Sequence, residues 1–245
     1  MIMLDKVIDF IFPRGYKCIL CGEELDHSTL YSICDSCLNS LPYNNGHNCL
    51  RCDRPLNNMG NYCTHCKNNK LYFKRNRSLF LYKKPINTIV RKLKYDNKRY
   101  LSETFSNMIA GEVSRMGQNF DIVIPVPLYF KRLKKRGYNQ SELLCESLKT
   151  KLNMNVNSTL LLKVRNTLPQ ANLTRSERVE NLNDAFMVRD KKAVKGKTIL
   201  LVDDVFTTGT TINECAKTLV EAGAKEVYSI TLAHAYFVNK DNNKD

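Results

Sequence analysis

The 245-residue sequence predicts an α/β protein, with a mostly parallel sheet and flanking helices, preceded by a small metal-stapled module. Two segments, 121–124 and 198–202, contain unbroken apolar runs (122–124 and 199–202) that are typical of buried strands. Each run is followed by a polar loop and a helical pattern, as parallel sheets require. Eight of the ten cysteines fall within residues 18–66. Together these observations predict one main α/β domain and one smaller module.

Composition narrows the class of protein. Lys and Arg total 38 against 24 Asp and Glu, a formal net charge of +14, which favours an anionic partner. No segment approaches the ~18 consecutive apolar residues of a membrane helix. Residues 1–15 are apolar, but Asp5, Lys6 and Asp9 interrupt them, so we expect a short amphipathic helix rather than a secretion signal. We therefore expect a cytoplasmic protein, whose cysteines bind metal more often than they form disulfides.

The eight cysteines form four CxxC pairs, and each pair offers two thiolates to one face of a tetrahedral ion. Four pairs predict two structural Zn²⁺ sites, most simply in sequential order, although cross-brace pairing stays open. A redox role would need a CxxC beside a βαβ unit, and the pattern shows none. The predicted ligands are Cys18, Cys21, Cys34, Cys37, Cys49, Cys52, Cys63 and Cys66.

The charge of the cysteine-containing segment argues against a zinc finger that reads DNA. Residues 1–66 hold five basic and seven acidic side chains, a net of −2, and bound zinc thiolates would make it about −6. A metal-stapled structural module is therefore favoured.

The positive charge is concentrated in residues 67–100, which hold twelve Lys and Arg against Asp96, or +11. Aromatic residues alternate with these cations, as in proteins that bind single-stranded nucleic acid. The alternative is a strand (78–82) and a helix (86–95) whose aromatics belong to the core and whose lysines are solvated. The nucleic-acid candidates are Lys74, Arg75, Arg77, Lys83, Lys84, Arg91, Lys92 and Lys94.

A second cationic segment follows the strand at 121–124. Pro125 and Pro127 end that strand, residues 131–136 carry five cations, and a helix is expected from Gln140 to about Leu152. This order places positive charge at the carboxyl end of the sheet, where α/β folds bind anions.

The strongest chemical motif follows the strand at 198–202. Asp203 and Asp204 end this strand, and the loop 207–211 precedes a helix expected from about Thr211 to Ala222. Gly209 permits a tight turn in which backbone N–H groups and hydroxyls converge on a phosphate. The carboxylates repel phosphate, so they suit sugar hydroxyls or a ligand-borne Mg²⁺. The motif therefore predicts a phosphorylated-sugar site rather than a Walker A loop, whose GxxxxGK is absent.

This strand–acid–acid–loop segment resembles the phosphoribosyl pyrophosphate signature of type I phosphoribosyltransferases. The whole chain resembles the ComF (ComFC) family of competence-associated proteins. Three further segments carry this resemblance: the four CxxC pairs, Pro125-Val-Pro-Leu with Arg136-Gly-Tyr-Asn-Gln140, and Gln170-Ala through Asn181-Leu-Asn-Asp-Ala-Phe186. The likeness spans nearly the full length.

The resemblance implies a role for each matching residue. Asp203 and Asp204 would bind the ribose hydroxyls of phosphoribosyl pyrophosphate, and Mg²⁺ would arrive with that ligand. The 5-phosphate would lie on Thr207, Thr208, Gly209, Thr210 and Thr211. Arg132, Lys135 and Arg136 would face the pyrophosphate. A mobile loop closing over the site would contain Gln170, Arg175, Arg178 and Asn181.

Two positions depart from the family pattern: Asp96-Asn97-Lys98, where many relatives carry a basic residue, Gly and Asp, and His234, where Arg is frequent. We expect His234 on the surface at the end of the last strand, and Cys145 and Cys215 as small core residues.

Three functions follow as hypotheses. The first is a competence protein of DNA uptake that binds phosphoribosyl pyrophosphate and single-stranded DNA, with partners such as a DNA-translocating helicase. The second is an active phosphoribosyltransferase of nucleotide metabolism, and the third a non-enzymatic adaptor. Catalytic turnover is favoured, but no catalytic base or acceptor is evident. The expected organisation is a double zinc-ribbon module at 1–66, a basic connector at 67–100 and a phosphoribosyltransferase-like domain at 101–240.

Overall fold

The computed structural model describes residues 17–25, 31–167 and 181–236. The expected N-terminal helix and Gln170, Arg175 and Arg178 lie outside these residues. The chain divides into two compact units between Leu41 and Pro42. Each unit is described by itself below. The ranges 1–66, 67–100 and 101–240 stay predictions.

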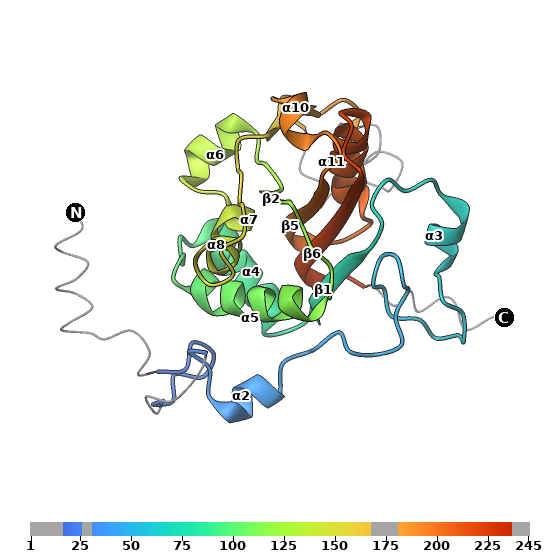
Figure 1. Ribbon diagram of the computed structural model, residues 1–245. Helices are drawn as coiled ribbons and strands as arrows, with labels where there is room; N and C mark the ends of the chain where they lie inside the picture. Colours follow the sequence, from blue (N-terminus) through green and yellow to red (C-terminus); the bar gives the residue numbers. More distant parts are fainter. Residues whose placement is uncertain (1–16, 26–30, 168–180, 237–245) are drawn as a thin grey trace. The chain divides into compact units, whose positions relative to one another are not determined.

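The larger unit is built on a parallel sheet with the strand order β1–β6–β5–β2 (Figure 1). These strands are β1 (Asn76–Leu81), β6 (Glu226–His234), β5 (Thr198–Phe206) and β2 (Ile122–Pro125). Every neighbouring pair is parallel, so all four carboxyl ends meet at one edge. The apolar run at the start of β5 is fully buried because helices cover both faces of the sheet. The predicted α/β class is confirmed.

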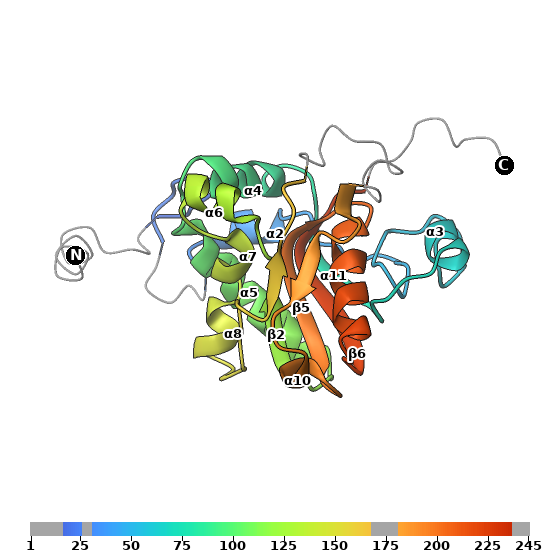
Figure 2. The same cartoon turned by 90° about the horizontal axis from the view of Figure 1, so that it is seen from above.

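Helices flank the sheet on two sides (Figure 2). The helices α5 (Leu101–Arg115) and α8 (Glu146–Thr150) lie on one face, and α11 (Thr210–Glu221) lies on the other. Cys145 and Cys215 are buried, as expected. Among its described residues, this unit also contains the helices α3 (Thr64–Asn68), α4 (Ile86–Tyr95), α6 (Phe130–Arg136), α7 (Gln140–Leu143) and α10 (Lys191–Val194).

The helix expected from 140 to about 152 is divided into α7 and α8, so that prediction was wrong in one detail. The hydroxyl of Ser106 on α5 accepts the backbone N–H of Ser147 at 2.7 Å, in place of a carbonyl of the preceding turn. A contact with a neighbouring helix thus overrides the local helical pattern. An antiparallel pair, β3 (Leu161–Lys163) and β4 (Phe186–Val188), packs beside α11 and was not predicted.

The second cysteine group belongs to the core of the larger unit. Cys49, Cys52, Cys63 and Cys66 are all buried and share one apolar cluster with Phe73, Phe206 and residues of α11. The Phe73 and Phe206 rings meet edge to face, with centroids 5.9 Å apart. This ribbon is therefore packed against the sheet as an integral part of the fold.

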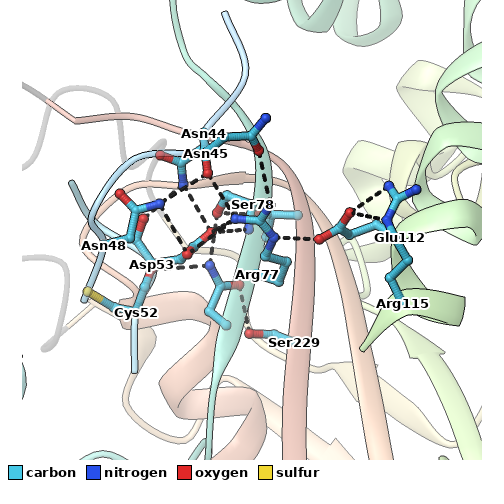
Figure 3. Close-up of polar contacts among 12 residues, drawn as sticks. Asn44, Asn45, Asn48, Cys52, Asp53, Arg77, Ser78, Glu112, Arg115 and Ser229 are labelled. Carbon is cyan, nitrogen blue, oxygen red and sulfur yellow. Dashed lines mark hydrogen bonds and ion pairs between the residues drawn. The ribbon is translucent and has the colours of Figure 1, made fainter. Parts of the chain in front are cut away.

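A partly buried ion network, centred on the buried Asp53, ties this ribbon to the sheet and to α5 (Figure 3). The guanidinium of Arg77 on β1 contacts Asp53 at 3.2 Å and Glu112 of α5 at 2.6 Å. Asp53 also accepts the backbone N–H of Ser78 at 2.7 Å and the side-chain amide of Asn44. Burial raises the pKa of Asp53 to about 6, against the opposing pull of Arg77.

The smaller unit holds the first cysteine group and a short helix, α2 (Asp35–Asn39). An isolated antiparallel β-bridge joins Lys17 to Glu24. The backbone N–H of Gly22 donates to the Cys18 carbonyl at 2.8 Å, which closes the turn that contains the first CxxC pair. Gly22 adopts a positive φ of 81° there, which favours glycine.

Candidate functional site

A cavity of about 800 Å³ opens beside the carboxyl ends of the parallel strands. Open α/β sheets bind their ligands at this edge. Residues from β5, α4, α6, α7 and β3 all reach it. Its lining includes Tyr82, Lys84, Arg91, Lys94, Tyr95, Arg132, Arg136, Ser141, Lys163, Asp203, Asp204, Thr207 and Thr211.

The predicted acidic pair lies in this cavity. Ser141 donates its hydroxyl to Asp203 Oδ1 at 2.9 Å, and the backbone N–H of Asp204 bonds to the same oxygen at 2.9 Å. The Lys94 ammonium lies 2.9 Å from Asp204 Oδ1 and 2.8 Å from Oδ2. The two carboxylates thus have different partners, a hydroxyl for Asp203 and a cation for Asp204.

Burial sets the protonation of this pair. Burial, and then the nearby charge of Asp204, raise the pKa of Asp203 to about 7, against the opposing effect of the Lys94 cation. Burial also lowers the pKa of Lys94, but the carboxylate of Asp204 outweighs this effect, so the net pKa is raised. Asp203 therefore changes its charge near neutral pH, while Lys94 stays a cation.

The loop after β5 has the shape that the motif predicts. Gly209 has a φ of 79° at the N-cap of α11, and a Cβ at this position would overlap the buried Phe206 ring. The hydroxyls of Thr208 and Thr210 lie 2.8 Å apart. The first turn of α11 starts at Thr210, so its backbone N–H groups point toward the cavity edge of the sheet. This arrangement suits a phosphate.

Cations outnumber carboxylates in the cavity lining. Arg132 and Arg136, one helical turn apart on α6, face the cavity, whereas Lys135 lies on the exposed side of that helix. Lys163 of β3 is a further cation that sequence reasoning missed. Burial, and then Arg132, lower its pKa to about 8. Among described residues the cationic lining is Lys84, Arg91, Lys94, Arg132, Arg136 and Lys163.

Ser141 was also missed, although the Gly-Tyr-Asn-Gln segment held a signal for it. The Asn139 side chain accepts the backbone N–H of Ser141 at 3.1 Å and donates to the Val126 carbonyl at 3.0 Å. Asn139 therefore caps α7 and fixes it to the end of β2, which aims Ser141 at Asp203. No sequence signal pointed to Lys163, because its position depends on the β3–β4 pair.

The residues predicted to bind nucleic acid do not lie together in the structure. Lys84, Arg91 and Lys94 line the cavity, and Lys83 and Lys92 are exposed on the same side of the sheet, after β1 and on α4. Arg77 is engaged in the ion network centred on Asp53. Lys74 pairs with Glu226 at 3.2 Å, and the exposed Arg75 follows it, at the opposite end of β1. The stretch is not one continuous surface. Asn181 is half-buried, while the other three predicted mobile-loop residues lie outside the described segments.

The cysteines form two four-thiol groups in sequential order. Within each group all sulfurs lie within 4.8 Å of one another. The sulfurs of Cys21 and Cys34 are 3.7 Å apart, and those of Cys52 and Cys63 are 3.6 Å apart. Tetrahedral zinc with Zn–S bonds of about 2.3 Å places its sulfurs about 3.8 Å apart, so both groups fit zinc. Burial raises the pKa of Cys18, but backbone N–H groups of Cys21 and Cys34 outweigh it and lower the pKa to about 6, which favours a thiolate ligand.

The expectation for His234 was wrong. Its side chain is fully buried rather than on the surface, and its ring packs on Phe206 with centroids 5.1 Å apart. Burial lowers the pKa of His234 to about 4, so the ring is neutral near pH 7. The end of β6 is covered because Cys49, Cys52 and Arg54 of the second ribbon lie beside His234.

Comparison with known proteins agrees with this geometry. The protein-family model for the phosphoribosyl transferase domain matches residues 139–244, and the family model for the double zinc ribbon domain matches residues 7–67. The fold and site define a protein with a type I phosphoribosyltransferase fold that carries a double zinc ribbon. The chain belongs to the ComF (ComFC) family of competence-associated proteins.

Three relatives show how far this similarity extends. The DNA utilization protein YhgH of Salmonella typhi is 30% identical over 86% of this chain and 93% of its own length. Competence protein F of Haemophilus influenzae is 28% identical over 90% of this chain and 98% of its own. Competence protein ComFC of Streptococcus pneumoniae is 29% identical over 88% and 99%, respectively.

Among solved structures, the chain is similar to the glutamine phosphoribosylpyrophosphate amidotransferase of B. subtilis, at 17% identity and a TM-score of 0.38. The match covers 64% of this chain and 32% of that enzyme, so the chain spans about a third of its length. A hypoxanthine phosphoribosyltransferase from Staphylococcus aureus matches at 10% identity and a TM-score of 0.34, over 56% of this chain and 65% of that one. Within the described residues, no helix has the length and apolar character to cross a membrane.

Proposed function

We propose that the cavity binds phosphoribosyl pyrophosphate together with Mg²⁺. The observation that carries this proposal is the acidic pair at the end of β5, directly followed by the glycine loop and the start of α11. Carboxylates suit the ribose hydroxyls, and the start of a helix suits the 5-phosphate. Six lining cations against two carboxylates fit a ligand of high negative charge.

Each part of the ligand has a partner in the chain. Asp203 and Asp204 accept hydrogen bonds from the ribose hydroxyls, and Thr207–Thr211 hold the 5-phosphate. Arg132, Arg136 and Lys163 face the pyrophosphate. Mg²⁺ bound with the ligand would further neutralise the pyrophosphate. Lys94 forms an ion pair with Asp204, so the ligand hydroxyls share or displace this ion pair.

The chemistry consistent with this site is pentosyl transfer. A nitrogen nucleophile attacks the ribose C1, the bond from C1 to the pyrophosphate oxygen breaks, and pyrophosphate leaves with the electron pair. The proton of the nucleophile passes to solvent. The lining arginines and Lys163 stabilise the leaving group, and the acidic pair orients the sugar.

The family supports a cellular role in the uptake and handling of DNA. Two relatives are named competence proteins, and a third is named a DNA utilization protein. We propose that this chain acts in the cytoplasm during transformation and binds incoming single-stranded DNA, together with other competence proteins such as a DNA-translocating helicase. The two cysteine groups each hold one structural Zn²⁺ in this proposal.

Calorimetric titration with phosphoribosyl pyrophosphate and Mg²⁺ tests the cavity. The full-length protein is expected to bind, and Asp203→Asn/Asp204→Asn is expected to bind at least tenfold more weakly, since hydrogen bonds to charged groups contribute about 1.5–3 kcal/mol each. Glu146→Gln/Glu221→Gln, on exposed helix ends outside the cavity lining, provides a control with the same change of charge. Unchanged affinity in the first variant would contradict the proposal.

Pyrophosphate release separates an enzyme from a ligand sensor. The protein is incubated with the donor, Mg²⁺ and either single nucleobases or ammonia, and released pyrophosphate is measured. Release that depends on one acceptor supports transfer. Tight binding without release for any acceptor would contradict the enzymatic proposal and support a ligand-sensing role.

A further inference from the structure

The helix α6 exposes an unusual combination of side chains. Its seven residues include five cations and no acid. Its two apolar side chains face solvent, with Phe130 60% and Leu133 41% exposed. Cations in the last turn and the left-handed Gly137 cap stabilise any helix end, so the charge alone has a structural explanation. The exposure of Phe130 has no such structural explanation, because its ring packs only partly on that of Tyr129, with ring centroids 4.6 Å apart.

Further aromatic side chains lie beside this helix. Tyr95, at the end of α4, is 73% exposed, and the Arg136 guanidinium lies 5.6 Å from the centre of its ring. Tyr100, in the following loop, is 52% exposed. Arg99 of that loop lies 4.4 Å over the Tyr138 ring, just after α6. The end of α4, the 96–100 loop and α6 therefore form one continuous surface.

This surface, which we call the α6 rim, borders the cavity. It comprises Tyr95, Tyr100, Phe130, Lys131, Leu133 and Lys134. Tyr95 and the adjacent Arg136 also line the cavity, so the rim and the cavity share an edge. Within residues 91–100, five cations face the single acid Asp96, which extends the positive surface beyond α6.

We propose that the α6 rim is the binding site for single-stranded DNA, with Lys131 and Lys134 on phosphates and with bases stacked on Phe130 and Tyr95. The inference rests on the proposed DNA-binding function and assigns its location. Aromatic rings set singly among cations match single-strand recognition, since a single strand presents base faces that a duplex hides. Membrane insertion is less suited, because an interfacial helix needs a wider apolar face than two side chains.

The proposed DNA-binding site differs from the one that the charge of residues 67–100 alone predicts. Lys74 and Arg75 lie at the opposite end of β1, and Arg77 is held by two carboxylates. Only the end of that stretch reaches the rim, where it meets cations from α6, more than thirty residues further along the chain. The fold therefore assembles the site from two separate cationic segments.

Fluorescence anisotropy with a labelled oligothymidine of about 20 nucleotides tests the proposal on the full-length protein. Phe130→Ala is expected to weaken binding about tenfold, at the lower end of the range for loss of one stacked base. Lys131→Ala/Lys134→Ala is expected to reduce the slope of log affinity against log salt by about 1.4, or about 0.7 for each lost phosphate contact.

Matched variants on other surfaces serve as controls. Lys149→Ala/Lys151→Ala removes two exposed cations at the end of α8, far from the rim (Figure 2), and Tyr62→Ala removes an aromatic ring that is 44% exposed. Both are expected to keep the wild-type affinity and slope. Retained zinc content and phosphoribosyl pyrophosphate binding show that each variant is folded.

The outcomes separate this inference from the proposed function. If the wild-type protein binds no oligothymidine even at low salt, its proposed DNA binding is wrong, and the rim assignment falls with it. If it binds but the rim variants keep their affinity and slope, DNA binding stands and the location is wrong. Equal affinity for a duplex of the same length, or rim-dependent binding to anionic vesicles alone, would likewise overturn the assignment.

Discussion

Gly209 shows how one residue determines the shape of the phosphate loop. Two constraints meet there: a φ of 79°, and the buried Phe206 ring in the space that a Cβ would occupy. Phe206 cannot move easily, because it packs edge to face on Phe73 and against His234. The loop geometry is therefore coupled to the core beneath it.

Replacement of Gly209 by alanine tests this coupling. Gly209→Ala is expected to lower the free energy of unfolding by about 3 kcal/mol, from left-handed backbone strain plus overpacking. Gly196→Ala is the matched control, since Gly196 has a φ of 70° but open space at its Cβ, and about 1 kcal/mol is expected. Urea unfolding measures both values, and equal losses would show that the Phe206 contact is unimportant.

Asp203 makes stability depend on pH. Its pKa is raised in the folded state to about 7, from the ordinary 3.8, so the folded protein binds a proton that the unfolded chain has released. Stability therefore falls as pH rises from about 4 to 7 and then stays level. Asp203→Asn removes this fall, so the Tm of the variant relative to wild type is expected to increase between pH 5 and pH 8. A constant difference in Tm would contradict the raised pKa.

At the scale of elements, the second ribbon is held to the sheet by a few buried polar contacts. Arg77 extends from β1 and reaches Asp53 of the ribbon and Glu112 of α5 (Figure 3). A buried ion pair adds little net stability when intact, but removal of one partner leaves the other charge buried and unpaired. The network therefore orients three elements relative to one another.

Arg77→Met is expected to reduce the free energy of unfolding by about 3 kcal/mol, because Asp53 remains buried beside an apolar side chain. Arg115→Met removes a 72% exposed partner of the same Glu112, and less than about 1 kcal/mol is expected. Urea denaturation followed by circular dichroism compares the two variants. Similar losses would place the stabilising effect on Glu112 rather than on Asp53.

At the scale of the whole molecule, the two cysteine groups differ in their surroundings. The four cysteines of the second group are buried in the core of the larger unit, whereas in the first group Cys21 is exposed and Cys34 and Cys37 are half-buried. Metal in the second group is therefore expected to contribute to the stability of the sheet.

Pairs of substitutions in each ribbon test this difference. Cys49→Ser/Cys52→Ser is expected to lower the Tm of the larger unit by at least 10 °C or to prevent its folding, since structural zinc sites contribute to folding directly. Cys18→Ser/Cys21→Ser is expected to leave that transition nearly unchanged. Calorimetry with zinc analysis measures both, and equal shifts would show that the units unfold together.

Much of the fold was predictable because the signals were local. The buried runs at 122–124 and 199–202, the acidic pair and the CxxC spacing are short patterns, and the strands and cysteine groups match them. What could not be predicted depends on contacts between distant segments. Lys163 reaches the cavity through the β3–β4 pair, and His234 is buried beside Cys49, Cys52 and Arg54, which lie far away in the sequence.

The ion pair between Lys94 and Asp204 was not predicted for the same reason: it joins two segments that lie far apart in the sequence. Lys94 was predicted as a nucleic-acid ligand from the charge of its neighbours, since nothing in the sequence shows that α4 points it into the cavity. The assignment of individual residues to phosphoribosyl pyrophosphate, and the domain limits, stay predictions that the experiments above address.

The burial of the second ribbon bears on how the protein can be shortened. A polypeptide beginning at residue 67 would leave out all four cysteines of the second group (Cys49, Cys52, Cys63 and Cys66) and Asp53. It would therefore open the sheet's apolar cluster and leave Arg77 without one of its carboxylates. A polypeptide beginning at Pro42 would keep every one of these contacts. The smallest independently folding part that contains the cavity is therefore expected to carry one zinc ion with it.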